Sequence, residues 1–193
     1  MIRIALFASG SGSNVENIIR HFSNSRELEF PLVISNRSEA YVHERVKKFM
    51  IPSYFFKKDD FENGRVLKFL QERNIDLIVL AGFLLKVPVN ILKAYPDRII
   101  NIHPALLPKF GGKGMYGSYV HEAVVASGEK ETGITIHFVN EYYDEGRIIF
   151  QAKCPVLHDD SPDDVATKVH ALEYEHFPRV VGEIASGISR SIF

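Results

Sequence analysis

Short runs of hydrophobic residues alternate with amphipathic segments through the first half of the chain. The runs are rich in β-branched residues and end at turn residues, which is typical of buried strands. The segments between them repeat hydrophobic residues at helical spacing, as at Val66, Phe69 and Leu70. In chain order, the predicted strands and helices are Ile2 to Phe7, Asn14 to Phe22, Pro31 to Ser35, Tyr41 to Phe49, Phe61 to Glu72, Asp76 to Leu80 and Ile99 to Ile102.

This alternation predicts an α/β fold, because right-handed crossovers through helices make successive strands parallel. We expect a single-domain, Rossmann-like, mostly parallel sheet that is flanked by helices. A length of 193 residues agrees with one domain.

The pattern changes after residue 104. The glycine-rich segment 109–117 predicts a mobile loop, and Ser118 is expected to cap a short helix that stops at Gly128. Two extended runs, Thr132 to Val139 and Arg147 to Val156, predict an antiparallel pair joined by a long turn. The C-terminal half therefore adds an antiparallel extension to the sheet.

A strong helix start follows at Ser161-Pro162-Asp163-Asp164. It combines a capping serine, a proline at the first helical position and acidic residues in the first turn. We expect Pro178 to kink or interrupt the helix that begins there.

Composition and charge exclude several classes of protein. A formal net charge of −1 gives no electrostatic reason to expect a nucleic acid or an anionic membrane as partner. The single cysteine, Cys154, rules out an intrachain disulfide and a thiolate metal cluster. The first hydrophobic run is too short for a signal peptide, and no run approaches the ~18 residues of a membrane span. We therefore expect a cytoplasmic protein.

A glycine-rich turn, Gly10-Ser11-Gly12-Ser13-Asn14, follows the first predicted strand and opens a helix. Free amides at a helix start attract anions, so a phosphate is the natural ligand. The dinucleotide pattern fits poorly, because Val15 stands where its third glycine belongs. Two alternatives remain open: a plain turn capped by Asn14, and an NADP-binding reductase that uses Arg37 for the 2′-phosphate.

Asn101 and His103 stand at the end of the strand that begins at Ile99. A strand period of two points both side chains to the same side, and Pro104 and Pro108 stiffen the chain that follows. Ligands of open α/β sheets bind at such strand ends, so this pair is a candidate site. Alternatively, Asn101 closes a turn and His103 is a buried, hydrogen-bonded histidine.

The turn Tyr142-Tyr143-Asp144-Glu145-Gly146 carries a third group of polar residues. Taken alone, acids beside glycine are ordinary surface-turn residues. His137, in the preceding strand, could belong to the core. A metal hydrolase using His103, His137 and Asp144 is a further alternative.

Taken together, these residues resemble those of the folate-dependent formyltransferase family. The matching stretches cover nearly the whole chain in the family's order: Ala8 to Asn14, Leu80 to Phe83, Asn101 to Pro108, Gly133 to Val139 and Asp144-x-Gly.

The resemblance implies transfer of a formyl group from 10-formyltetrahydrofolate to the amine of glycinamide ribonucleotide, a step of purine biosynthesis. Within the family, the Gly-Ser-Gly-Ser-Asn turn indicates the branch that acts on this ribonucleotide. The resemblance also implies one domain, 1–193, with a phosphate-binding half, 1–100, and a catalytic and folate-binding half, 101–193. The folate serves as co-substrate and no metal is required; the oligomeric state stays open. Hydrolysis of the formyl donor to formate is the related alternative.

Residues carried over by position complete the predicted site. The catalytic trio falls on Asn101, His103 and Asp144. The ribonucleotide is expected at Gly12, Ser13, Asn14, His170 and Glu173. The folate is expected at Leu84, Leu85, Lys86, Val87, Asn140, Glu141, Tyr142 and Tyr143, with Arg65 for its tail. Asp144 is expected to raise the pKa of His103 and favour an imidazolium that stabilises an oxyanion beside Asn101.

Overall fold

Seven strands form one sheet in the order β3-β2-β1-β4-β5-β6-β7 in the computed structural model, which describes residues 1–190. The first five strands of this order, from β3 to β5, are parallel to one another. Strand β6 pairs antiparallel with β5, and β7 pairs antiparallel with β6 at the edge of the sheet. The predicted fold class is therefore confirmed. The strands are β1 (Ile2–Phe7), β2 (Leu28–Ser35), β3 (Ser53–Phe55), β4 (Leu77–Leu80), β5 (Ile99–His103), β6 (Glu131–Phe138) and β7 (Ile148–Pro155).

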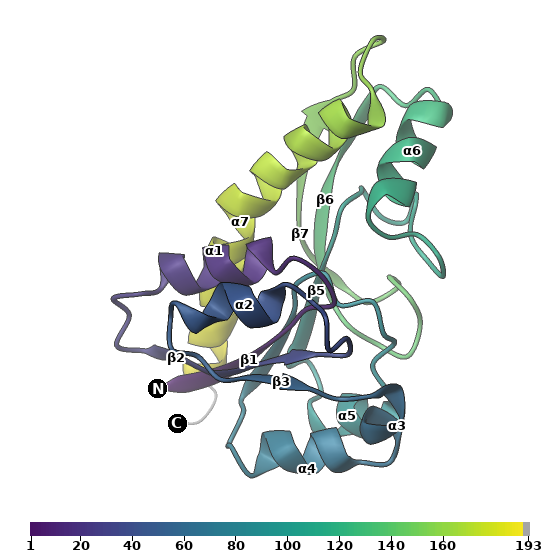
Figure 1. Ribbon diagram of the computed structural model, residues 1–193. Helices are drawn as coiled ribbons and strands as arrows, with labels where there is room; N and C mark the ends of the chain where they lie inside the picture. Colours follow the sequence, from purple (N-terminus) through teal and green to yellow (C-terminus); the bar gives the residue numbers. More distant parts are fainter. Residues whose placement is uncertain (191–193) are drawn as a thin grey trace.

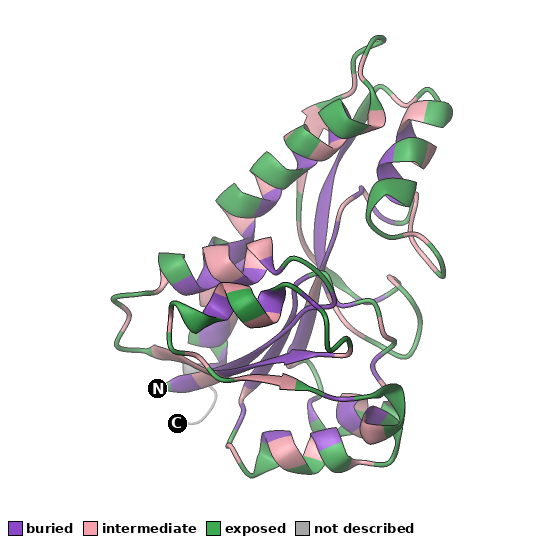
Figure 2. Cartoon of the chain, in the orientation of Figure 1, coloured by how far each residue is buried: buried purple, intermediate pink, exposed green. Residues whose placement is uncertain are grey.

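Helices cover both faces of the sheet (Figure 1). They are α1 (Ser13–His21), α2 (Val42–Lys47), α3 (Lys58–Glu62), α4 (Arg65–Gln71), α5 (Val89–Ala94), α6 (Ser118–Ala126) and α7 (Pro162–Arg190). One hydrophobic core joins the sheet to α1, α2, α6 and α7, and a second joins it to α3, α4 and α5. The central strands are buried between the two cores, as Figure 2 shows.

Strand β2 starts at Leu28, three residues earlier than predicted, and contains Pro31. Proline cannot donate a ladder hydrogen bond, so it is tolerated only at edges and bulges. The register of β1 against β2 shifts here, because Arg3 faces Glu29 whereas Ala5 faces Leu32. This bulge accommodates Pro31 within the strand.

The predicted helix from Phe61 to Glu72 was wrong, because two helices occupy this segment. Gly64 has a φ of +86°, a conformation outside the α-helix, and it separates α3 from α4. The short elements β3 and α5 were not predicted. Ser118 does not cap α6: it is the first helical residue, and Gly117 holds the cap position.

Helix α7 begins as predicted, with a reciprocal cap between Ser161 and Asp164. The Ser161 amide donates to Asp164 Oδ2 at 2.9 Å, and the Asp164 amide donates to Ser161 Oγ at 3.2 Å. Pro178 does not interrupt the helix. It removes the amide that would bond the Tyr174 carbonyl, and Asn17 Nδ2 of α1 donates to that carbonyl instead, at 2.9 Å.

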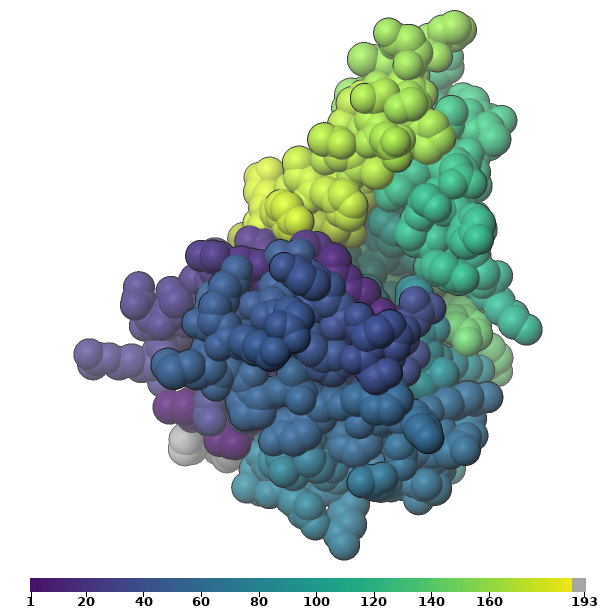
Figure 3. Space-filling model, viewed as in Figure 1, coloured from purple at the N-terminus to yellow at the C-terminus, as the bar shows by residue number. Residues whose placement is uncertain are grey.

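The N-terminal elements form a rounded body, and α6 with the N-terminal part of α7 projects beyond it (Figure 3). Helices α6 and α7 pack against each other, and α7 also packs on α1, β1, β6 and β7. Among residues 1–190, no helix is sufficiently long and apolar to cross a membrane.

Candidate active site

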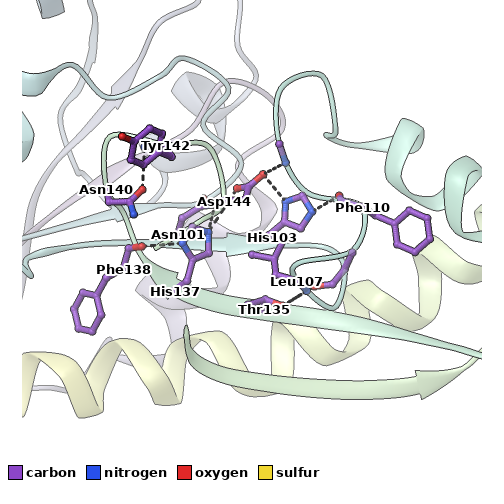
Figure 4. Close-up of polar contacts among 12 residues, drawn as sticks. Asn101, His103, Leu107, Phe110, Thr135, His137, Phe138, Asn140, Tyr142 and Asp144 are labelled. Carbon is purple, nitrogen blue, oxygen red and sulfur yellow. Dashed lines mark hydrogen bonds and ion pairs between the residues drawn. The ribbon is translucent and has the colours of Figure 1, made fainter. Parts of the chain in front are cut away.

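Asn101 and His103 lie at the carboxyl end of β5, next to the first antiparallel strand. In the β5–β6 register, Asn101 faces His137 and His103 faces Thr135. Asn101 Nδ2 lies 3.1 Å from His137 Nε2, so the two side chains meet across the strands (Figure 4). His103 and His137 are 4% and 2% exposed, which makes this a largely desolvated polar cluster.

The hydrogen bonds of His137 fix the orientation of the Asn101 amide. His137 Nδ1 lies 2.8 Å from the Phe138 carbonyl oxygen, which can only accept, so Nδ1 carries the hydrogen. The Asn101 atom 3.1 Å from Nε2 is Nδ2, which donates to Nε2 when that nitrogen carries no hydrogen. The second hydrogen of that NH₂ group is left to serve a ligand.

Asp144, in the turn after β6, lies close to both histidines. Its Oδ2 lies 3.6 Å from His103 Nδ1, and its Oδ1 lies 3.6 Å from His137 Nε2. The Gly112 amide donates to Oδ2 at 2.9 Å, which ties the glycine-rich segment to the carboxylate. Segment 109–117, predicted as a loop, is one and contacts this cluster. Figure 4 shows the trio converging as predicted.

Close backbone packing holds this cluster in place. A Cβ atom at Gly111 would lie 2.5 Å from Leu107 Cδ2 and 3.2 Å from Asp144 Cβ. Asp144 itself has a φ of +57°, a left-handed conformation that few residues other than glycine adopt. Such strain persists only where the surroundings fix it, as they commonly do at functional sites.

Burial, more than charge, decides the ionisation of His103. Desolvation lowers its pKa below the ordinary 6.5, although Asp144 and the Phe110 carbonyl act to raise it. The expectation of a raised pKa was therefore wrong in net direction. Burial acts to raise the pKa of Asp144, yet His137, His103 and the Gly112 amide together lower it. A neutral His103 thus lies beside an ionised Asp144 near pH 7.

The His103 hydrogen bonds identify the nitrogen that can take up a proton. Nε2 lies 2.7 Å from the Phe110 carbonyl oxygen and must carry the hydrogen. Nδ1 is then the unprotonated nitrogen, and it is the one near Asp144.

The residues predicted to bind the ribonucleotide lie close together in the structure, although they are far apart in the sequence. Asn14 Nδ2 donates to Glu173 Oε2 at 2.9 Å, and His170 Nδ1 lies 2.9 Å from the same oxygen. The hydrogen bond with Glu173 raises the pKa of His170. Gly12, with a φ of +70°, precedes Ser13 at the start of α1. The free amides at the start of α1, which suit a phosphate, thus lie near a carboxylate that can accept hydrogen bonds from sugar hydroxyls.

Helix α2 packs against the turn at residues 10–14. The Val42 amide donates to the Gly10 carbonyl at 3.0 Å, and Arg45 Nε donates to the Ser11 carbonyl at 2.6 Å. A Cβ atom at Gly12 would lie 2.4 Å from Val42 Cγ2, so only glycine allows this approach. Because α2 binds the carbonyl groups, the turn has a fixed conformation.

Two segments predicted for the folate lie side by side. Lys86 Nζ lies 5.5 Å from the centre of the Tyr143 ring, which brings residues 84–87 to the turn 140–143. The Leu84 amide donates to Ser9 Oγ at 2.8 Å, so this segment is also fixed to the end of β1. Arg65 instead pairs with Asp60 and lies over Phe56. Its place near the folate stays a prediction.

Sequence reasoning did not predict that His137 forms a hydrogen bond with Asn101, and it assigned no role to His121. A single histidine in a hydrophobic strand indicates a core residue, and only the β5–β6 register reveals Asn101 opposite His137. Within residues 1–190 no three His, Cys, Asp or Glu side chains are arranged to hold a metal ion.

An amide and an imidazole at the end of β5, with a carboxylate from the turn after β6, are groups that suit acyl transfer. The family model for formyl transferases matches residues 2–181, and the chain belongs to this family. Its curated relatives include phosphoribosylglycinamide formyltransferase of Haemophilus influenzae, 35% identical over 193 residues and matched over 97% of this chain and 89% of the relative.

Plant relatives bear the same name. The chloroplastic phosphoribosylglycinamide formyltransferases of Arabidopsis thaliana and Vigna unguiculata are 40% and 39% identical, over 94% and 93% of this chain. The chain spans 65% and 59% of the length of these two relatives.

Solved structures agree with the sequence relatives. Glycinamide ribonucleotide transformylase 1 of Symbiobacterium toebii has a TM-score of 0.88 at 34% identity, covering 97% of this chain and 89% of that one. The phosphoribosylglycinamide formyltransferase of Anaplasma phagocytophilum has the same TM-score and identity, covering 96% and 87%.

Proposed function

We propose that this protein transfers the formyl group of 10-formyltetrahydrofolate to the amine of glycinamide ribonucleotide, in the cytoplasm, as a step of purine biosynthesis. Family membership supports formyl transfer, and the names of the relatives support this acceptor. The observation that carries the choice of acceptor is the hydrogen bond between Asn14 and Glu173. It joins a phosphate-type turn to a carboxylate suited to sugar hydroxyls, and the charge of Glu173 acts on His103.

The ribonucleotide is proposed to lie along these residues. Its phosphate binds Gly12, Ser13 and Asn14, and its ribose binds Glu173 and His170. The glycinamide amine then reaches the end of β5. The formyl donor is proposed to bind between residues 84–87 and 140–143, where the Lys86–Tyr143 contact lies.

Asn101 is proposed to stabilise the oxyanion that forms when the amine attacks the formyl carbon. The negative charge develops on the formyl oxygen, and a fixed donor near it lowers the barrier without reorganisation. The His137 hydrogen bond holds the Asn101 NH₂ group in the donating orientation. His137 is therefore a positioning residue.

His103 is proposed to carry the proton from the attacking nitrogen to the departing folate nitrogen. Its lowered pKa leaves it neutral and able to accept at Nδ1. Asp144, 3.6 Å from Nδ1, stabilises the imidazolium that then forms. His103 gives this proton to the folate nitrogen when the carbon–nitrogen bond to the folate breaks. His103 is therefore neutral again at the end of the cycle.

A formyl-transfer assay with glycinamide ribonucleotide tests this function. We expect the wild-type protein to formylate the ribonucleotide, and His103→Ala to reduce the rate by about 10²–10³-fold. His158→Ala, at an exposed histidine outside the site, is the matched control. Formate release that is equally fast without any amine acceptor would instead identify a hydrolase.

A further inference from the structure

His121 is a buried imidazole that the proposed mechanism does not use. It lies in α6, is 4% exposed, and its Nδ1 atom has no hydrogen-bond partner within residues 1–190. A buried polar atom without a partner costs free energy, so it calls for a ligand or water that completes it.

The neighbours of His121 are the proposed sugar-binding residues. Helix α6 packs on α7, and the ring centres of His121 and His170 are 6.3 Å apart, with 69° between the ring planes. The charge of Glu173 acts on the His121 ring, and so does His103 when it is protonated. His121 therefore lies within electrostatic range of the proposed sugar-binding residues and of His103.

A second buried atom without a partner belongs to the same group. Asn14 Oδ1 has no partner, while Nδ2 of this residue is bound to Glu173. The oxygen can only accept a hydrogen bond. His121 Nδ1 can donate or accept, because burial and the nearby His170 lower the pKa of His121 and keep its ring neutral. A hydroxyl group both donates and accepts, so sugar hydroxyls match this pair of atoms.

We propose that His121 is an additional ligand-binding residue, whose Nδ1 forms a hydrogen bond with a hydroxyl group of the ribose 5-phosphate part of the substrate. The position of the sugar rests on the proposed function. The assignment of His121 rests on its own burial and on its Nδ1 atom. It adds α6 to the elements that bind the ribonucleotide.

Calorimetric titration with two probes, ribose 5-phosphate and inorganic phosphate, separates sugar binding from phosphate binding. His121→Phe keeps a ring and removes the polar atoms, so we expect about tenfold weaker binding of ribose 5-phosphate and unchanged binding of phosphate. His121→Asn places a polar atom on Cγ, as Nδ1 is, and should restore affinity to within about threefold. His121→Gln places it one bond further and should not. His158→Phe is the surface control.

Three results would overturn the inference: unchanged ribose 5-phosphate affinity in His121→Phe, equal weakening of both probes, or no restoration by His121→Asn. Should His121→Phe fail to fold, the Asn and Gln variants decide by the same comparison. The formyl-transfer assay of the wild type is independent. A protein that needs His121 for ribose 5-phosphate but transfers no formyl group keeps this inference and loses the proposed function.

Discussion

His103 and Asp144 show how burial and charge divide the work within a single pair of residues. Desolvation favours the neutral imidazole before the reaction, whereas the carboxylate favours the imidazolium formed during it. A fully exposed histidine would lack the first influence, and one without Asp144 would lack the second. The pair therefore suits the uptake and release of a proton that the proposed mechanism requires.

Replacing Asp144 by asparagine tests the second influence. Asp144→Asn keeps the size of the side chain and removes the charge, so we expect kcat to fall by about 10³-fold or more. The KM for the ribonucleotide should change less than threefold, because the residues proposed to bind the ribonucleotide lie mainly on α1 and α7, away from Asp144. Steady-state kinetics with both substrates measures this. Near-wild-type turnover would remove Asp144 from the mechanism.

The ionisation of His103 can be followed directly by NMR. We expect the wild-type His103 ring to titrate below pH 6.5, because burial outweighs the nearby carboxylate. In Asp144→Asn the attraction is lost, so the pKa should fall further. His103→Gln identifies the resonance among the eight histidines. A titration above pH 6.5 in the wild type would contradict the neutral resting state.

At this scale the sequence predicted the shared side of Asn101 and His103 but not their supports, and Asp144 joined the predicted trio only through the family resemblance. The catalytic role of all three stays a prediction. Asn101 and His103 could be predicted because a strand's period of two is local. His137 and His121 could not, because their partners depend on strand register and on the packing of α6 against α7. The pKa of His103 was misjudged for the same reason, since the degree of burial is a property of the folded chain.

Helix α7 shows how one element compensates for an unfavourable residue. Pro178 leaves the Tyr174 carbonyl without its helical partner, and Asn17 of α1 supplies the missing donor. Sequence rules correctly identify Pro178 as a disruption of the hydrogen-bond ladder. They cannot show that a side chain from another helix supplies the missing donor. The helix continues through Pro178, and a kink there stays a prediction.

A double-mutant cycle tests this compensation. We expect Asn17→Ala to reduce the free energy of unfolding by about 1 kcal/mol, because the carbonyl loses its donor. In a Pro178→Ala background the helix regains its own amide, and Asn17→Ala should then cost well under half as much. Urea denaturation of the four proteins gives the coupling energy. Additive effects would show that Asn17 acts independently of Pro178.

At the scale of the whole molecule, strand order decides which distant residues meet. The alternation of strands and helices predicts a parallel sheet. It does not fix the order β3-β2-β1-β4-β5-β6-β7, in which only β4 separates β1 from β5 and β1 contacts α7. The division into halves 1–100 and 101–193 stays a prediction, although a single core includes residues of both.

Phe177 offers a test of how the two halves depend on each other. It is fully buried on α7, in the core that also contains β1 and α1 residues. We expect Phe177→Ala to reduce the free energy of unfolding by about 3–5 kcal/mol. Hydrogen exchange should show β2 and β6 losing protection together. Leu157→Ala, 55% exposed, is the control. Protection lost in β6 alone would indicate independent halves.

The bond between Asn14 and Glu173 has a consequence for biosynthesis of the protein. These residues are 159 positions apart, so the turn at residues 10–14 leaves the ribosome long before its partner carboxylate is made. During translation an unfinished chain holds the turn at residues 10–14 but no Glu173 to pair with Asn14. The completed pair arises only once α7 has docked. On the proposed function, ribonucleotide binding would stabilise only chains that have been synthesised and folded through α7, and substrate abundance would selectively protect those chains from degradation.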